Sequence, residues 1–180
     1  MSNDKLTSTS YVVLGSIAML RRATSYDLKR LVGMSIGHFW TFPHSQLYAE
    51  PERLVRLGLL TEDRETGGRR RRVYSITEDG EKELEDWLRD PRTDPAEVRY
   101  PATLKLFFGN LVDGEAVVSL AKQQIEVSEG LLDEYRRIED QFSEVTGLEY
   151  QMATLRCGIA VEVAVLDFWK EIAEKPPARP

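Results

Sequence analysis

One hairpin signal in an otherwise helical sequence restricts the fold of this chain more than any other feature. Two short strand-like runs, LLTEDRE (59–65) and RRRVYSI (70–76), flank a Gly-Gly pair at 67–68. A glycine pair permits the positive φ angles of a tight hairpin turn. Helical patterns precede the first run and follow the second, so the hairpin is expected to lie within a mainly α domain.

Three helices are expected before the hairpin. The apolar run YVVLGSIAML (11–20) predicts a buried first helix, and Thr24 with Asp27 three residues later is close to a capping box for a second helix over 25–36. The third helix should carry Pro43 in its first turn and end at Gly58. Its buried face should contain Leu47, Leu54 and Leu57.

A fourth helix should follow the hairpin. Thr77 is a suitable N-cap, and the apolar face would comprise Leu84, Trp87 and Leu88. The order helix, helix, helix, hairpin, helix within about 80 residues is that of a winged helix-turn-helix domain. We therefore predict a mainly α fold with a small β-hairpin wing.

The segment RDPRTDPAE (89–97) contains two prolines and mixed charge, which is typical of a linker. Beyond it, two long amphipathic patterns cover 113–142 and 147–173. Helices of this length, about 40 Å at 1.5 Å per residue, usually pack against a partner. We expect a DNA-binding domain over 1–90, a helical dimerisation domain over 91–175, and a disordered tail over 176–180.

The distribution of charge permits a nucleic-acid partner despite the net charge of −6. Residues 91–180 hold 10 basic and 16 acidic side chains, which accounts for the whole imbalance, whereas residues 20–72 hold 11 basic and 6 acidic side chains. Salt screens charges beyond about 8–10 Å, so an acidic second half does not prevent DNA binding by a basic surface in the first half.

Two groups of residues are candidates for contacting DNA. The third helix carries polar side chains on its exposed faces, where glutamine can pair with adenine and arginine with guanine or phosphate. Four consecutive arginines follow the hairpin turn and could reach phosphates or a minor groove. The candidates are His44, Ser45, Gln46, Tyr48, Arg53, Arg69, Arg70, Arg71 and Arg72.

Several motifs in this order resemble the PadR family of bacterial transcriptional regulators. They are SQLYAEPERLVRLGLLTED, RRRRVYSITEDGEKEL and LKLFFGNL. The resemblance implies a homodimer held by the C-terminal helices, with two recognition helices that bind a near-palindromic operator in double-stranded DNA. It also implies a repressor, and several members release DNA when they bind a small, often phenolic or drug-like, compound.

The chain departs from the family pattern at Pro51, where an aliphatic residue is usual. Proline removes the hydrogen bond from position 51 to the Leu47 carbonyl and costs about 3 kcal/mol or more within a helix. The helix should therefore either bend at Pro51 or restart there. The angle at which it meets DNA should differ from that of its relatives.

A small aromatic effector would need an apolar pocket, and six aromatic residues are candidates to line one. Alternatively, these residues simply fill the core and the interface. They are Trp40, Trp87, Tyr100, Phe107, Phe108 and Trp169. We expect no cofactor, no metal site at His38 and His44, and a free thiol at Cys157. The absence of a signal-peptide pattern and of a long apolar run indicates a cytoplasmic protein without a membrane partner.

The expected activity is regulation of transcription, and no catalytic motif indicates an enzyme. The alternative is a protein–protein interaction module that uses the winged fold and the helical arm without specific DNA binding. The acidic second half favours this alternative slightly, whereas the arginines of the wing oppose it.

Overall fold

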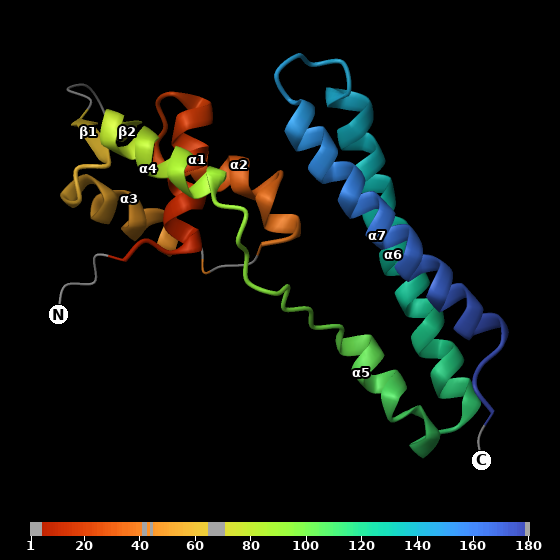
Figure 1. Ribbon diagram of the computed structural model, residues 1–180. Coiled ribbons are helices and arrows are strands. Elements are labelled where there is room, and N and C mark those ends of the chain that lie inside the picture. The colour runs from red at the N-terminus through yellow and green to blue at the C-terminus, as the bar shows by residue number, and fades with distance from the viewer. Residues whose placement is uncertain (1–4, 41–42, 44, 65–70, 179–180) are drawn as a thin grey trace. The chain divides into compact units, whose positions relative to one another are not determined.

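The computed structural model describes residues 5–40, 43, 45–64 and 71–178, and the chain divides into two compact units, residues 1–94 and 95–180 (Figure 1). The first unit contains α1 (Ser8–Leu20), α2 (Ser25–Gly33), the 3-10 turn η1 (Ile36–His38), α3 (Gln46–Arg56), β1 (Leu60–Arg64), β2 (Arg72–Ile76) and α4 (Glu78–Arg89). The second unit contains α5 (Pro101–Phe107), the 3-10 turn η2 (Gly109–Leu111), α6 (Gly114–Phe142) and α7 (Glu149–Glu174). The predicted fold class and order of elements are confirmed. Of the predicted DNA contacts, His44, Arg69 and Arg70 lie outside the described residues.

Threonine hydroxyls cap α1, α2 and α4 in the first unit. The predicted capping box at Thr24 and Asp27 starts α2, and Thr77 caps α4 by accepting a hydrogen bond from the Gly80 N–H at 3.0 Å. The first helix begins at Ser8, three residues earlier than expected. The reason is a capping box made of two hydroxyls, in which Thr7 and Ser10 exchange backbone hydrogen bonds.

Two helices are shorter than predicted. The second helix ends at Gly33 instead of residue 36, because the Met34 N–H closes the last turn on the Arg30 and Leu31 carbonyls and η1 then takes a tighter winding. The third helix starts at Gln46, and Pro43 lies in the turn before it, with its carbonyl accepting from the Gln46 N–H at 2.9 Å.

The core of the first unit lies where α1, α2, α3 and the hairpin meet (Figure 1). Its fully or almost fully buried apolar side chains are Val13, Leu14, Ile17, Ala23, Leu28, Val32, Leu47, Leu54, Leu60 and Tyr74. The two strands pair antiparallel from Leu60 opposite Ile76 to Arg64 opposite Arg72. Ala23 adds a short antiparallel bridge to Tyr74, with N···O distances of 2.8 and 3.0 Å, so the base of the wing is tied to the start of α2.

The third helix continues through Pro51 as one element, so the predicted alternative, a helix that restarts at Pro51, is wrong. Leu47, Pro51 and Leu54 form its buried face. Leu57 is only half-buried because it caps the end of the helix, before Gly58 takes a positive φ of 76°.

The apolar face predicted for α4 is only partly correct. Leu84 packs against the core, but Trp87 is 45% exposed and Leu88 is 67% exposed. Residues 85–89 are all exposed, since the last turn of α4 runs beyond the core.

The two long helices of the second unit lie side by side (Figure 1). They contact each other partly through small residues: Ala121 and Ser128 of α6 are buried, and a Cβ at Gly158 of α7 would stand 3.4 Å from the Tyr135 ring. Val127 of α6 is 58% exposed in the single chain. Within the described residues no helix is both long and apolar enough to cross a membrane.

Candidate DNA-binding surface

The outward face of α3 is polar and free of bulky aliphatic side chains. Since Leu47, Pro51 and Leu54 take the buried face, the helical period turns a continuous strip of residues to solvent. The exposed residues at and within this helix are Ser45, Gln46, Tyr48, Ala49, Glu52 and Arg56. Ser45, Gln46 and Tyr48 were predicted as DNA contacts, and the structure brings them together on this face; Arg56 extends it by one turn.

Both carboxylates of α3 are paired with arginine. Glu50 accepts from Arg53 at 2.8 Å, and Glu52 pairs with Arg72 of β2, which also lies 3.7 Å from Glu62 of β1. A hydrogen bond with Tyr74, followed by the two carboxylates, raises the pKa of Arg72. The acidic residues therefore add little unbalanced negative charge to the helix, and Arg72 links the wing to α3.

The wing and α2 contribute basic residues beside this helix. Arg71 is exposed, as are Lys29, Arg30 and Tyr26 of α2. Hydrogen bonds from the Thr24 hydroxyl and N–H lower the pKa of Asp27, and the charges of Arg30 and Arg71 lower it further. Arg71 is thus within electrostatic reach of the start of α2. The α2 residues were not predicted as contacts; their signal was their position opposite the buried Leu28 and Val32.

Two predicted contacts are held by α1. The Gln46 side-chain carbonyl accepts from the Thr9 hydroxyl at 3.0 Å. The Arg53 side chain is only 19% exposed and donates to Glu50 and to the Ser10 hydroxyl. Gln46 remains exposed, whereas Arg53 points towards α1.

The six aromatic residues proposed for an effector pocket are divided between the two units, with Trp40 and Trp87 in the first and the other four in the second. In the first unit, Trp87 stacks on Tyr11 with ring centroids 4.5 Å apart. In the second unit, Phe107 and Phe108 contact each other edge to face. Tyr100 and Trp169 line a groove of about 490 Å³ between α5, α6 and α7, together with Phe168, and the remaining lining is also mostly apolar. Trp40 is 45% exposed.

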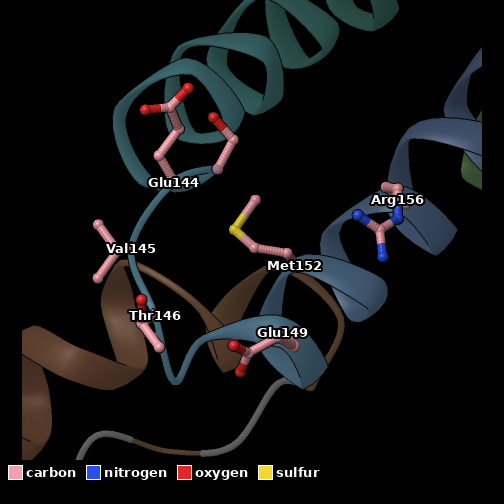
Figure 2. Close-up of a pocket in the computed structure, with 7 residues that line it drawn as sticks. Glu144, Val145, Thr146, Glu149, Met152 and Arg156 are labelled. Carbon is pink, nitrogen blue, oxygen red and sulfur yellow. The ribbon is translucent and has the colours of Figure 1, made fainter.

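A second hollow, of about 240 Å³, lies at the turn between α6 and α7 (Figure 2). Glu144, Val145 and Thr146 come from the turn, and Met152 and Arg156 from α7. The Glu149 carboxylate accepts from the Gly147 N–H at 3.1 Å, and this bond lowers the pKa of Glu149. The Glu149 carboxylate of this hollow is therefore already used in a hydrogen bond at the start of α7. Among the described residues, no group of three His, Cys, Asp or Glu could hold a metal ion.

A two-stranded wing beside a helix with a polar outward face, followed by a pair of long helices, defines a winged helix-turn-helix protein with a helical arm. Residues 13–86 match the model of the PadR-like transcriptional regulator family, and residues 98–175 match the model of the virulence activator alpha C-terminal region. Over residues 13–86 the chain is therefore similar to the PadR-like family of transcriptional regulators.

Known regulators resemble the chain over most of its length. The negative transcriptional regulator PadR of Bacillus subtilis is 28% identical over 128 residues, which is 69% of each chain. A probable transcriptional regulator of Mycobacterium tuberculosis is 29% identical over 182 residues, covering 88% of this chain and 93% of the relative.

Solved structures share the fold. Bacillus subtilis PadR in complex with operator DNA has a TM-score of 0.82 at 22% identity, covering 93% of this chain and 98% of that one. The Vibrio cholerae virulence activator AphA has a TM-score of 0.72 at 27% identity, covering 93% and 97% of the two chains. PadR of Bacillus subtilis has also been solved with p-coumaric acid, at a TM-score of 0.75 and 20% identity.

Proposed function

We propose that the chain is a homodimeric, sequence-specific DNA-binding repressor, released from its operator by a small aromatic effector. The observation that carries this proposal is the outward face of α3, where Ser45, Gln46 and Tyr48 lie together, the acidic residues are paired, and Arg71 of the wing is exposed nearby. Serine, tyrosine and glutamine can bind phosphate or base edges, and arginine can bind phosphate.

The relatives support operator binding and release. Bacillus subtilis PadR is described as a negative regulator and has been solved with operator DNA and with p-coumaric acid. In this chain the groove at Tyr100 and Trp169 has an apolar lining of suitable size for one aromatic ring system.

A dimer is supported by the apolar side chains that the second unit leaves exposed in a single chain. They include Val127 and Val161 of the long helices, which are 58% and 50% exposed. Large apolar side chains left exposed on a long helical pair are typical of an association surface. A symmetric dimer would place two copies of α3 about one turn of DNA apart, roughly 34 Å, or a multiple of it. A solution mass near twice 20.6 kDa would support the dimer, and a mass near 20.6 kDa would oppose it.

Genomic selection of bound fragments, beginning with the protein's own promoter, tests the proposed function. A gel shift on a selected fragment and a scrambled fragment of equal length, at several salt concentrations, then separates specific binding from general attraction. Equal affinity for both fragments, or none for either, would instead favour the protein–protein interaction module.

The wing is tested by replacing Arg70 and Arg71 together with alanine. Each phosphate contact adds about 0.9 to the salt slope, so losing two contacts should flatten the slope by up to about 2 on both fragments. Lys122→Ala with Lys175→Ala, both in the second unit, is the matched control for lost positive charge. An unchanged slope in the arginine variant would remove the wing from the mechanism.

Activation of transcription is a second candidate. Residues 98–175 match the C-terminal model named after a virulence activator, and AphA shares the fold over 93% of this chain. Transcription from a selected promoter with increasing protein distinguishes the two signs, since repression predicts a fall and activation a rise.

A further inference from the structure

The proline within α3 weakens the helix in the stretch proposed to contact DNA. Pro51 is the sixth of eleven residues in this helix, and it has no N–H to donate to the Leu47 carbonyl. Its ring is also buried in the core. One backbone hydrogen bond is therefore missing between the second half of α3 and the first half, which holds Gln46 and Tyr48 and follows Ser45.

A side-chain pair spans this point. Glu50 precedes the proline and Arg53 follows it by two residues. The Arg53 Nε donates to the two Glu50 carboxylate oxygens at 3.2 and 3.1 Å, and Nη2 donates to Oε1 at 2.8 Å. The two side chains are 14% and 19% exposed, so they are well shielded from solvent.

The same pair is anchored to α1 by Ser10, which is fully buried. The Ser10 hydroxyl donates to Glu50 Oε1 at 2.7 Å and accepts from Arg53 Nη2 at 2.9 Å. It also accepts from the Thr7 N–H at 2.8 Å, as part of the capping box of α1. A hydroxyl has one donor and two acceptor positions, so these three bonds fill them, and Thr7 Oγ1 also lies within 3.2 Å of Ser10 Oγ.

We propose that Glu50 and Arg53 form a clamp across Pro51 that holds both halves of α3 at a fixed angle to α1, and that Arg53 is a positioning residue for DNA recognition and not itself a DNA contact. This inference rests on the proposed function. It differs from the sequence-based prediction for Arg53, because a guanidinium that shares a shielded carboxylate and a buried hydroxyl is oriented inward, towards α1.

The clamp predicts a specific pattern of binding. Arg53→Met should lower the ratio of affinities for the selected and scrambled fragments at least tenfold while leaving the salt slope unchanged, because no phosphate contact is lost. Glu50→Gln should produce the same loss, and the double variant should be no worse than either single variant, since both belong to one network.

A direct phosphate contact by Arg53 predicts the opposite pattern. Arg53→Met would then flatten the slope by about 0.9, and Glu50→Gln would tighten binding by releasing the arginine from its carboxylate. Either result would overturn the clamp. Ser10→Ala removes the anchor to Glu50 and Arg53 together with one bond of the α1 capping box, and it should lower the affinity ratio in the same direction.

Rescue by Pro51→Ala separates positioning from general damage. Alanine restores the backbone donor to Leu47, so the Glu50→Gln variant should regain the wild-type affinity ratio when Pro51 is also replaced. Far-UV circular dichroism of every variant checks that the helices form. A wild-type protein without preference for the selected fragment would refute the proposed function itself, whereas a discriminating wild type with no loss in Glu50→Gln, or no rescue by Pro51→Ala, would refute the clamp alone.

Discussion

Among the described glycines of the first unit, Gly80 of α4 is the one where an added carbon should do most harm. A Cβ there would lie 2.2 Å from the Leu59 carbonyl oxygen and 2.9 Å from Ile76 Cγ1. Contacts between such atoms are favourable only beyond about 3.5 Å, so Gly80→Ala must open the gap between α4 and the base of β1 by roughly 1 Å. The atom in the way is backbone, and rotation of a side chain cannot relieve the clash.

Three hydrogen bonds oppose that movement. The Leu59 carbonyl accepts from the Thr77 N–H at 3.1 Å, the Thr77 hydroxyl donates to the Gly58 carbonyl at 2.8 Å, and the same hydroxyl accepts from the Gly80 N–H. Each is worth about 0.5–1.5 kcal/mol, and overpacking costs about 1–3 kcal/mol. Some of these losses overlap, so we expect Gly80→Ala to lower the free energy of unfolding by about 2–4 kcal/mol.

Urea unfolding of the full chain, followed by circular dichroism at one fixed protein concentration, measures this loss. In thermal unfolding of the same variant, the Tm should fall by roughly 5–15 °C, since a chain of this size loses about 2–4 °C per kcal/mol. Gly15→Ala in α1 is the matched control: its Cβ would meet Leu84 Cδ1 only at 4.0 Å, and the change should stabilise the helix by about 0.5–1 kcal/mol. A loss below about 0.5 kcal/mol for Gly80→Ala would refute the close approach on which this reasoning depends.

Three further changes test other parts of the molecule. Thr24→Ala removes the cap of α2 and should lower the free energy of unfolding by about 1 kcal/mol at pH 6. Thr24 lowers the pKa of Asp27 below its usual 3.8, so the stabilisation that this pair provides is present above pH 3.8 and is lost as the pH falls through the lower pKa of the folded state. Urea unfolding of the variant and the wild type from pH 6 to pH 3 would show this loss. Leu132 of α6 is 1% exposed, so Leu132→Ala should lower the free energy of unfolding by about 2–5 kcal/mol. Val127→Ala should lower it little, unless the stability of the protein depends on its concentration. Equal losses of stability in the two variants, measured at one protein concentration, would contradict the packing. Gln46→Ala should relax base preference by about 1–3 kcal/mol at one position in each half-site, measured by binding to singly substituted operators, and an unaltered preference would remove Gln46 from the reading face.

The sequence predicts the first unit well because its signals are local. Thr24 with Asp27, and Thr77 before α4, satisfy backbone donors within a few residues of themselves, and the glycine pair lies between two strand-like runs. The start of α1 was harder to place, because its capping box joins two hydroxyls, Thr7 and Ser10, inside a run of similar residues.

The contacts between elements could not be predicted in the same way. The roles of Glu50 and Arg53 depend on Ser10, some forty residues earlier in the chain, and a one-dimensional pattern shows both only as polar residues on a helix. In the second unit, hydrophobic spacing predicted the extents of the long helices but not the small residues Ala121 and Ser128 that α6 buries. Which residues two elements bury between them depends on the distance between those elements, and the periodicity of the sequence does not give that distance.

The fully used hydroxyl of Ser10 carries an evolutionary consequence. Alanine at position 10 would leave hydrogen-bonding groups of Thr7, Glu50 and Arg53 without their partner, and a larger residue would not fit a site that is 0% exposed. The choice of residue in the first helix is thereby tied to a proline in the third. In relatives that carry an ordinary helix former at the position of Pro51, we expect substitutions at positions 10, 50 and 53 to be tolerated independently, and in those that keep the proline we expect all three to change together.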